Sequence, residues 1–196
     1  MGKKELTRRQ NLIDQFVASF KKLDEMTAFD HDPIAIELAS AEMNEFGFRE
    51  WRAKEVNTNP AALDALYAKL PARFPPIYEQ LVLSYRWAEV DLRLFRLLPN
   101  PPGSDLKGLQ EQIITRDPAI WDCLSKSGYM QFGKGPDMDY DPVCFDLSSR
   151  TKNGDYRVVK VDHEEILCND RLKVVAQLAA SFEDLVLETI GLAAKK

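Results

Sequence analysis

The amino-acid sequence predicts an α+β fold: a curved, mainly antiparallel sheet packed by flanking helices, with an N-terminal helical extension. Two observations lead to this prediction. Stretches with apolar residues at helical spacing are interrupted by short stretches with period-two spacing, and no alternation of strand and helix is sustained along the 196 residues. In addition, an Asn-Gly pair between two apolar stretches is typical of a hairpin, which joins antiparallel strands.

The first predicted helix covers residues 7–26. Its apolar side chains recur at three- and four-residue spacing, and they are Ile13, Phe16, Phe20 and Leu23. A stripe of this kind either packs against its own domain, which is the more common arrangement, or binds a partner helix.

The segment Asn57-Thr58-Asn59-Pro60 marks a boundary between two parts of the chain. We expect an N-terminal helical extension at residues 1–56 and an α+β domain at residues 57–196. The total length is that of a single domain, so we expect the two parts to form one compact unit.

Three helices are predicted to begin at an Asx-Pro pair. The Asx side chain can accept a hydrogen bond from an unpaired amide of the first turn, and proline has no N–H to lose there. The pairs are Asp32-Pro33, Asn59-Pro60 and Asp117-Pro118. Apolar spacing predicts three more helices: one beginning at Pro75-Pro76, one capped by Ser104 or Asp105, and one at about residues 173–190.

Period-two spacing predicts four strands. In the first, Val90, Leu92 and Leu94 alternate with charged residues. The others cover residues 129–132, 143–147 and 156–161, and a turn at Lys152-Asn153-Gly154-Asp155 joins the last two. We therefore expect two adjacent antiparallel strands with Phe182 packed on the sheet, and their core residues are Val143, Phe145, Val159 and Val161.

Charge and cysteine content narrow the function. The net charge of −5 argues against a general nucleic-acid binder, which usually carries a basic face. Three scattered cysteines without a CxxC pair indicate a reducing compartment, so we expect a cytoplasmic protein. The sequence contains no run of about 18 apolar residues, so no membrane-spanning helix and no membrane partner are expected.

No metal, cofactor or catalytic residue is predicted. The chain has two histidines, His31 and His163, which is too few for a multi-histidine zinc site. The segment at 137–141 begins like a calcium loop but lacks the glycine and the glutamate that such a loop requires. The glycine-rich segment at 128–135 lacks the Ser or Thr of a phosphate-binding loop, and no nucleophile elbow is present.

The densest titratable cluster is predicted to form a partner-binding edge. Loops and strand ends on a rigid sheet commonly carry recognition. Tyrosine provides contact area with one polar group, and clustered carboxylates attract a basic partner. The predicted contact residues are Tyr140, Asp141, Asp146, Asp162, His163 and Glu164.

Several short motifs of the second half occur in a specific order. They are Leu70-Pro71, Phe74-Pro75, the segment 128–133, the segment 140–146, the segment 158–164 and the segment 178–185. In this order and spacing, residues 60–190 resemble the SUKH superfamily of fungal glucan-synthesis and cell-wall-assembly regulators and bacterial toxin-immunity proteins. The resemblance implies a compact α+β domain that binds a protein rather than catalyses a reaction.

We therefore expect a non-catalytic protein-binding module of the bacterial toxin-immunity type, with a basic toxin domain as its protein partner. Two alternatives remain open. One is a regulatory scaffold of the cell-wall-assembly-regulator type that uses the apolar stripe of residues 7–26 on a partner helix. The other is a small-ligand-binding protein or enzyme that uses Tyr140, Asp146 and His163.

Overall fold

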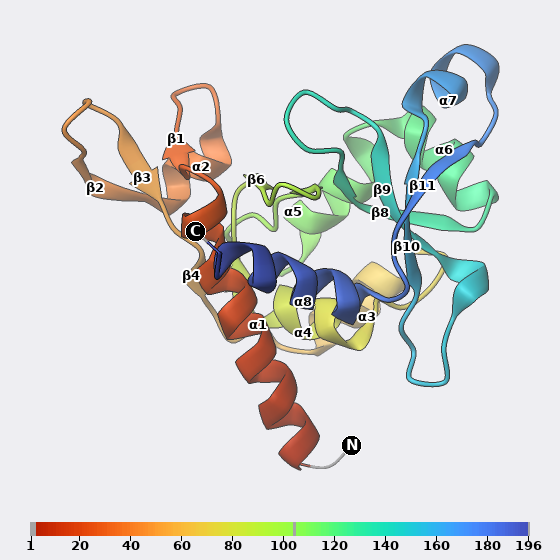
Figure 1. The fold of residues 1–196 in the computed structure, drawn as a ribbon, viewed down its shortest axis with the longest axis horizontal. Coiled ribbons are helices and arrows are strands. Elements are labelled where there is room, and N and C mark those ends of the chain that lie inside the picture. The colour runs from red at the N-terminus through yellow and green to blue at the C-terminus, as the bar shows by residue number, and fades with distance from the viewer. Residues whose placement is uncertain (1–2, 104, 196) are drawn as a thin grey trace.

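The largest sheet of the described chain is antiparallel and six-stranded, with strand order β11-β10-β9-β8-β7-β6. Figure 1 shows β8, β9, β10 and β11 side by side. The computed structural model describes residues 3–103 and 105–195, and it confirms the predicted α+β class. The strands are β6 Val90–Asp91, β7 Arg96–Leu97, β8 Tyr129–Lys134, β9 Pro142–Asp146, β10 Arg157–Val161 and β11 Val174–Ala179.

Helices cover both faces of this sheet. One face carries the large core cluster with α1, α3, α4, α5 and α8, and the other carries a smaller cluster with α6 and α7. All five residues of β9 are buried because the strand lies between these two layers. The helices are α1 Lys3–Leu23, α3 Ala61–Tyr67, α4 Pro76–Ser84, α5 Lys107–Gln110 with its π-helical continuation Glu111–Thr115, α6 Pro118–Lys126, α7 His163–Asn169 and α8 Phe182–Ala193.

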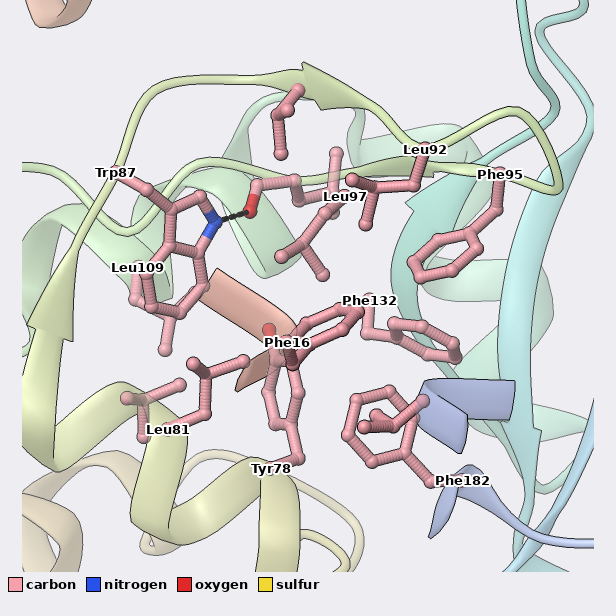
Figure 2. Close-up of a cluster of buried hydrophobic side chains, with 14 of the residues drawn as sticks. Phe16, Tyr78, Leu81, Trp87, Leu92, Phe95, Leu97, Leu109, Phe132 and Phe182 are labelled. Atoms are coloured by element: carbon pink, nitrogen blue, oxygen red, sulfur yellow. Dashed lines mark hydrogen bonds between the residues drawn. The ribbon is translucent and has the colours of Figure 1, made fainter. Parts of the chain in front are cut away.

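Aromatic rings fill the centre of the large cluster (Figure 2). Phe132 and Phe145 stack with ring centroids 4.2 Å apart. Phe182 of α8 meets the two rings edge-on, at 5.3 and 5.5 Å. Tyr78 of α4 closes the group at 5.4 Å from Phe182. The prediction that Phe182 packs on the sheet is therefore confirmed.

Helix α1 is part of this core. It packs against α4 and α8, and Ile13, Phe16 and Phe20 are fully buried. These side chains are therefore unavailable to a partner helix. The prediction that the apolar stripe packs on its own domain is confirmed, and the alternative that it binds a partner helix is wrong. The boundary at residue 56 stays a prediction. Next to this boundary, strand β4 Lys54–Glu55 pairs with strand β5 Tyr85–Arg86 of the second part of the chain.

The N-terminal extension contains strands as well as helices. A small sheet of order β1-β3-β2 follows α1, and its strands are β1 Thr27–Ala28, β2 Ala39–Met43 and β3 Arg49–Trp51. Helix α2, Pro33–Leu38, lies between β1 and β2 in the chain. The sequence did not predict these strands, because the solvent-facing β2 has no buried residue and therefore no apolar alternation.

The Asx-Pro starts are confirmed at two of three positions. Asp32 accepts hydrogen bonds from the amides of Ile34 and Ala35, and Asp117 accepts one from Ile120. Asn59 accepts from the amide of Ala61, but α3 begins one residue after the expected proline. Of the two residues predicted to cap the helix at 107, Ser104 lies outside the described residues, and Asp105 accepts from the amide of Lys107 at 3.1 Å.

Two predicted elements are wrong. Instead of one strand through Leu94, the chain forms a hairpin between β6 and β7. The Asp91 side chain accepts a hydrogen bond from the amide of Arg93, and the Arg93 backbone is left-handed with φ 71°, which turns the chain here. The expected helix at 173–190 begins only at Phe182, and residues 174–179 form the edge strand β11. Backbone pairing with β10 stabilises this strand, and residues distant in sequence supply that pairing.

The predicted hairpin of residues 143–161 is confirmed with a longer connection. In the antiparallel pair β9–β10, Phe145 lies opposite Val158 and Val143 lies opposite Lys160. Asn153-Gly154 closes only a small loop, in which the amide of Thr151 donates to the carbonyl of Asp155 at 2.8 Å. A 3₁₀ turn, Leu147–Ser149, separates this loop from β9.

Candidate functional site

The structure brings five of the six predicted contact residues together and separates the sixth. Asp141 immediately precedes β9, whereas Asp146 ends it. At about 3.3 Å per residue, the two are about 16 Å apart along the strand. Asp146 is 4 % exposed and binds Arg157 at 2.8 Å. It therefore stabilises the far end of the β9–β10 pair, and its predicted place on the edge is wrong.

The remaining residues come from two segments that meet beside the start of β9. Tyr140 and Asp141 lie in the loop before β9, and Asp162, His163 and Glu164 lie where β10 leads into α7. Asp141 Oδ1 lies 2.7 Å from His163 Nδ1 and accepts the His163 amide at 3.0 Å. The Tyr140 and His163 ring centroids are 6.2 Å apart. The Asp141–His163 pair therefore holds the two segments together.

Two lysines form ion pairs with three of the carboxylates at this edge. Lys160 Nζ lies 2.7 Å from Asp139 Oδ2 and 3.7 Å from Asp141 Oδ2. The hydrogen bond to Asp139 raises the pKa of Lys160. Asp162 binds Lys173 at 2.9 Å and caps α7 through the amide of Glu165, and these bonds lower the pKa of Asp162. The edge is therefore an ion-paired surface rather than a cluster of free carboxylates.

An exposed apolar group surrounds this ion-paired edge. Tyr140 is 51 % exposed, Met138 of the same loop is 75 % exposed, and Leu167 of α7 is 55 % exposed. Glu164 is exposed in the first turn of α7, and its carboxylate has no ion pair within the described residues. We call Met138, Tyr140, Glu164 and Leu167 the loop face. Sequence reasoning missed Leu167 because α7 is short and polar and was not predicted as a helix. It also missed Met138, which lies in the loop before β9, where no periodic spacing marks it.

A cavity of about 250 Å³ opens next to the loop face, between β8, α6, α7 and the π-helical turn. Tyr140 and His163 line it together with Lys134, Arg116 and Gln131. Sequence reasoning considered Lys134 only as part of a phosphate-loop motif and did not consider Arg116. These two residues are 18 positions apart, so only the folded chain shows that they share a cavity.

The comparisons with known proteins add no assignment. A scan against protein-family models found no match to this chain, and a search of curated proteins found none either. The resemblance to the SUKH superfamily therefore stays a prediction. Among the helices of residues 3–103 and 105–195, none is long and apolar enough to cross a membrane.

Chelation is expected to leave the fold and the melting temperature unchanged. Lys160 and His163 already pair with Asp139 and Asp141, and the described part of the chain groups no three His, Cys, Asp or Glu side chains as metal ligands. The measurement is a thermal melt with and without excess EDTA. A drop of several degrees would refute the prediction and assign a structural cation to the loop at 137–141, because metal binding is coupled to folding.

Proposed function

We propose that this chain is a non-catalytic cytoplasmic protein-binding module of the toxin-immunity type, and that its partner binds at the loop face. One observation carries the proposal: three large apolar side chains, Met138, Tyr140 and Leu167, are about half exposed or more around a rigid, ion-paired edge. Exposed apolar groups held on a rigid scaffold are typical of protein interfaces, where aromatic residues and methionine are enriched.

The charge of the chain supports a basic partner. The net charge is −5, and Glu164 places a free carboxylate on the loop face itself. Because most neighbouring carboxylates are paired with lysines, we expect long-range steering by the whole molecule rather than a strong local field. The resemblance to the SUKH superfamily supports a toxin domain as the partner.

The cysteines support a reducing compartment. Cys123 and Cys144 are buried as free thiols, and Cys168 is free and exposed. Burial raises the pKa of the Cys144 thiol well above its usual value, which keeps it protonated and unreactive. A cytoplasmic protein has no need of disulfides, and these thiols fit that proposal.

Replacing Tyr140 or Leu167 with alanine is expected to weaken partner binding tenfold or more, since large anchors at an interface centre dominate affinity. The measurement is affinity capture with wild-type and variant baits, followed by quantitative mass spectrometry and titration of each captured protein. The matched control is Leu187→Ala, because Leu187 is 50 % exposed on α8. A partner that Leu187→Ala loses and Tyr140→Ala retains would contradict the loop face.

Charge reversal distinguishes long-range electrostatic attraction of the partner from direct contact at the loop face. Glu164→Lys is expected to slow association several-fold at low salt, and the difference from wild type should shrink as salt rises. Glu188→Lys, on the exposed side of α8, changes the net charge equally and is the control. A non-toxin regulatory partner captured through the same face would favour the regulatory scaffold over the immunity protein.

A further inference from the structure

The cavity beside the loop face has an apolar inner wall and a polar mouth. Leu98, Ile113 and Ile120 line the inner wall and are at most 4 % exposed. The volume of about 250 Å³ is near the lower end for small-molecule sites. A ligand of this cavity is therefore small, and part of its surface is apolar.

A β-bulge directs a lysine into this cavity. In a regular strand, residues 131 and 134 point to opposite faces of the sheet. The register of β8 against β9 shifts between Gln131 and Gly133, and Gln131 and Lys134 consequently both line the cavity. Phe132, between them, points into the aromatic core on the other face (Figure 2).

The Lys134 ammonium has no direct partner in the described structure. Its side chain is half-buried, and no hydrogen bond or ion pair reaches its Nζ from residues 3–103 or 105–195. Burial is the main cause that lowers the pKa of Lys134, and the nearby Arg116 lowers it further, whereas Glu89 and Asp117 act in the opposite direction. A cation that is removed from water without a partner is costly to the folded state. A bound anion would therefore stabilise this arrangement.

The other charged groups around Lys134 are already engaged. Glu89 binds Arg116 at 3.1 Å and Arg96 at 3.5 Å, so it is shared between two guanidinium groups. Asp117, at the mouth, accepts the amide of Ile120 as the N-cap of α6. Arg116 is 41 % exposed at the rim, where its remaining N–H groups can donate to a ligand. The mouth thus offers one ammonium without a direct partner and one guanidinium to a ligand, with the Asp117 carboxylate as the one negative group in the lining.

We propose that this cavity binds a small organic carboxylate, whose negative group pairs with Lys134 and Arg116. The apolar body of the ligand lies against the inner wall, next to Ile113 and Ile120. Phosphate is disfavoured because it has no apolar part to fill that wall, and a doubly charged group needs more donors than the mouth supplies. Tyr140 and Leu167 of the loop face also line the cavity. The inference still does not rest on the proposed function, because ligand binding is measured without a protein partner.

The test uses benzoate, neutral benzamide and inorganic phosphate as probes. Each is titrated into the full-length protein while the amide resonances of β8 and α7 are followed by NMR. Benzoate is expected to bind saturably and at least tenfold more tightly than benzamide, because a charge-assisted hydrogen bond separates the two. Equal affinity for benzamide, tighter binding of phosphate, or no benzoate binding up to its solubility limit would each overturn the proposal.

Two variants locate the charge. Lys134→Met is expected to weaken benzoate binding at least tenfold while leaving the melting temperature of the free protein equal or higher, because an unpaired ammonium is removed. Lys152→Met, in an exposed turn, is the control and should leave benzoate affinity unchanged. Arg116→Gln, at the rim, is a second, independent variant and is expected to weaken benzoate binding several-fold. Unchanged benzoate affinity in both Lys134→Met and Arg116→Gln would show that the cavity is not the site.

Discussion

Replacing Phe182 with alanine is expected to lower the free energy of unfolding by about 3–5 kcal/mol. The Phe182 ring is fully buried and meets the rings of Tyr78, Phe132 and Phe145 edge-on. Its removal deletes the aromatic part of the contact between α8 and the sheet and leaves a cavity among the surrounding rings. Each aromatic pair contributes about 0.5–1.5 kcal/mol beyond the buried area, so the loss is at the upper part of the usual range.

Equilibrium urea unfolding measures this loss. Leu187→Ala is the matched control, because it truncates an apolar residue of the same helix that is 50 % exposed. We expect a change of less than about 1 kcal/mol for the control, as is usual at exposed positions. A loss below about 1 kcal/mol for Phe182→Ala would contradict its central place in the core.

Features that depend on neighbouring residues could be predicted from the sequence. The caps at Asp32 and Asp117 involve amides two or three residues away, so composition at the helix start is sufficient to predict them. The strands β8, β9 and β10 were also predicted, because their short apolar stretches have the spacing of strands and a turn signal lies between the last two. The α+β class follows from these elements.

Elements that depend on distant partners could not be predicted in the same way. The apolar residues at 175 and 178 fit a helix that continues to 186, and the actual strand β11 is stabilised by pairing with β10. Helix α7 has seven residues and buries only Ile166, so it carries no periodic apolar stripe. In both cases tertiary contacts decide between local alternatives.

Asp141 and Asp146 lie at opposite ends of β9, so only one of them can lie beside α7, and the strand register decides which. A two-residue turn at Asn153-Gly154 would place Asp146 opposite Val161 and therefore beside Asp162 and His163. The 3₁₀ turn after β9 changes the register, and Asp146 instead lies opposite Arg157, with which it forms an ion pair. The same register brings Asp141 to His163, which is why the rest of the edge is assembled as predicted.

The lysines that neutralise the edge were missed for the same reason. Lys160 and Lys173 reach Asp139 and Asp162 across 21 and 11 residues of sequence. Counting carboxylates along the chain therefore overstates the local negative field. Around this edge, the structure instead indicates the exposed apolar side chains of the loop face and Lys134 as groups without a direct partner.

Replacing Asp155 with alanine is expected to have the second large effect on stability, of about 3 kcal/mol or more. Asp155 is 9 % exposed, and its carboxylate accepts the amides of Tyr156, Phe182 and Glu183 at 2.7, 3.0 and 3.2 Å. It therefore joins the start of β10 to the N-terminus of α8, where a negative charge also interacts favourably with the helix dipole. Alanine leaves three amides without an acceptor, and each hydrogen bond to a charged group contributes about 1.5–3 kcal/mol.

Two variants distinguish this role from ordinary helix capping. Ser181→Ala removes the N-cap of the same helix, the hydroxyl that accepts the amide of Asp184, and is expected to cost about 1 kcal/mol. Asp155→Asn keeps one carbonyl acceptor and should fall between the two alanine variants in urea unfolding. If Asp155→Ala costs no more than Ser181→Ala, the carboxylate acts only as a local turn residue. A larger loss indicates instead that the anchoring of α8, and with it the position of Phe182, depends on this single buried acceptor.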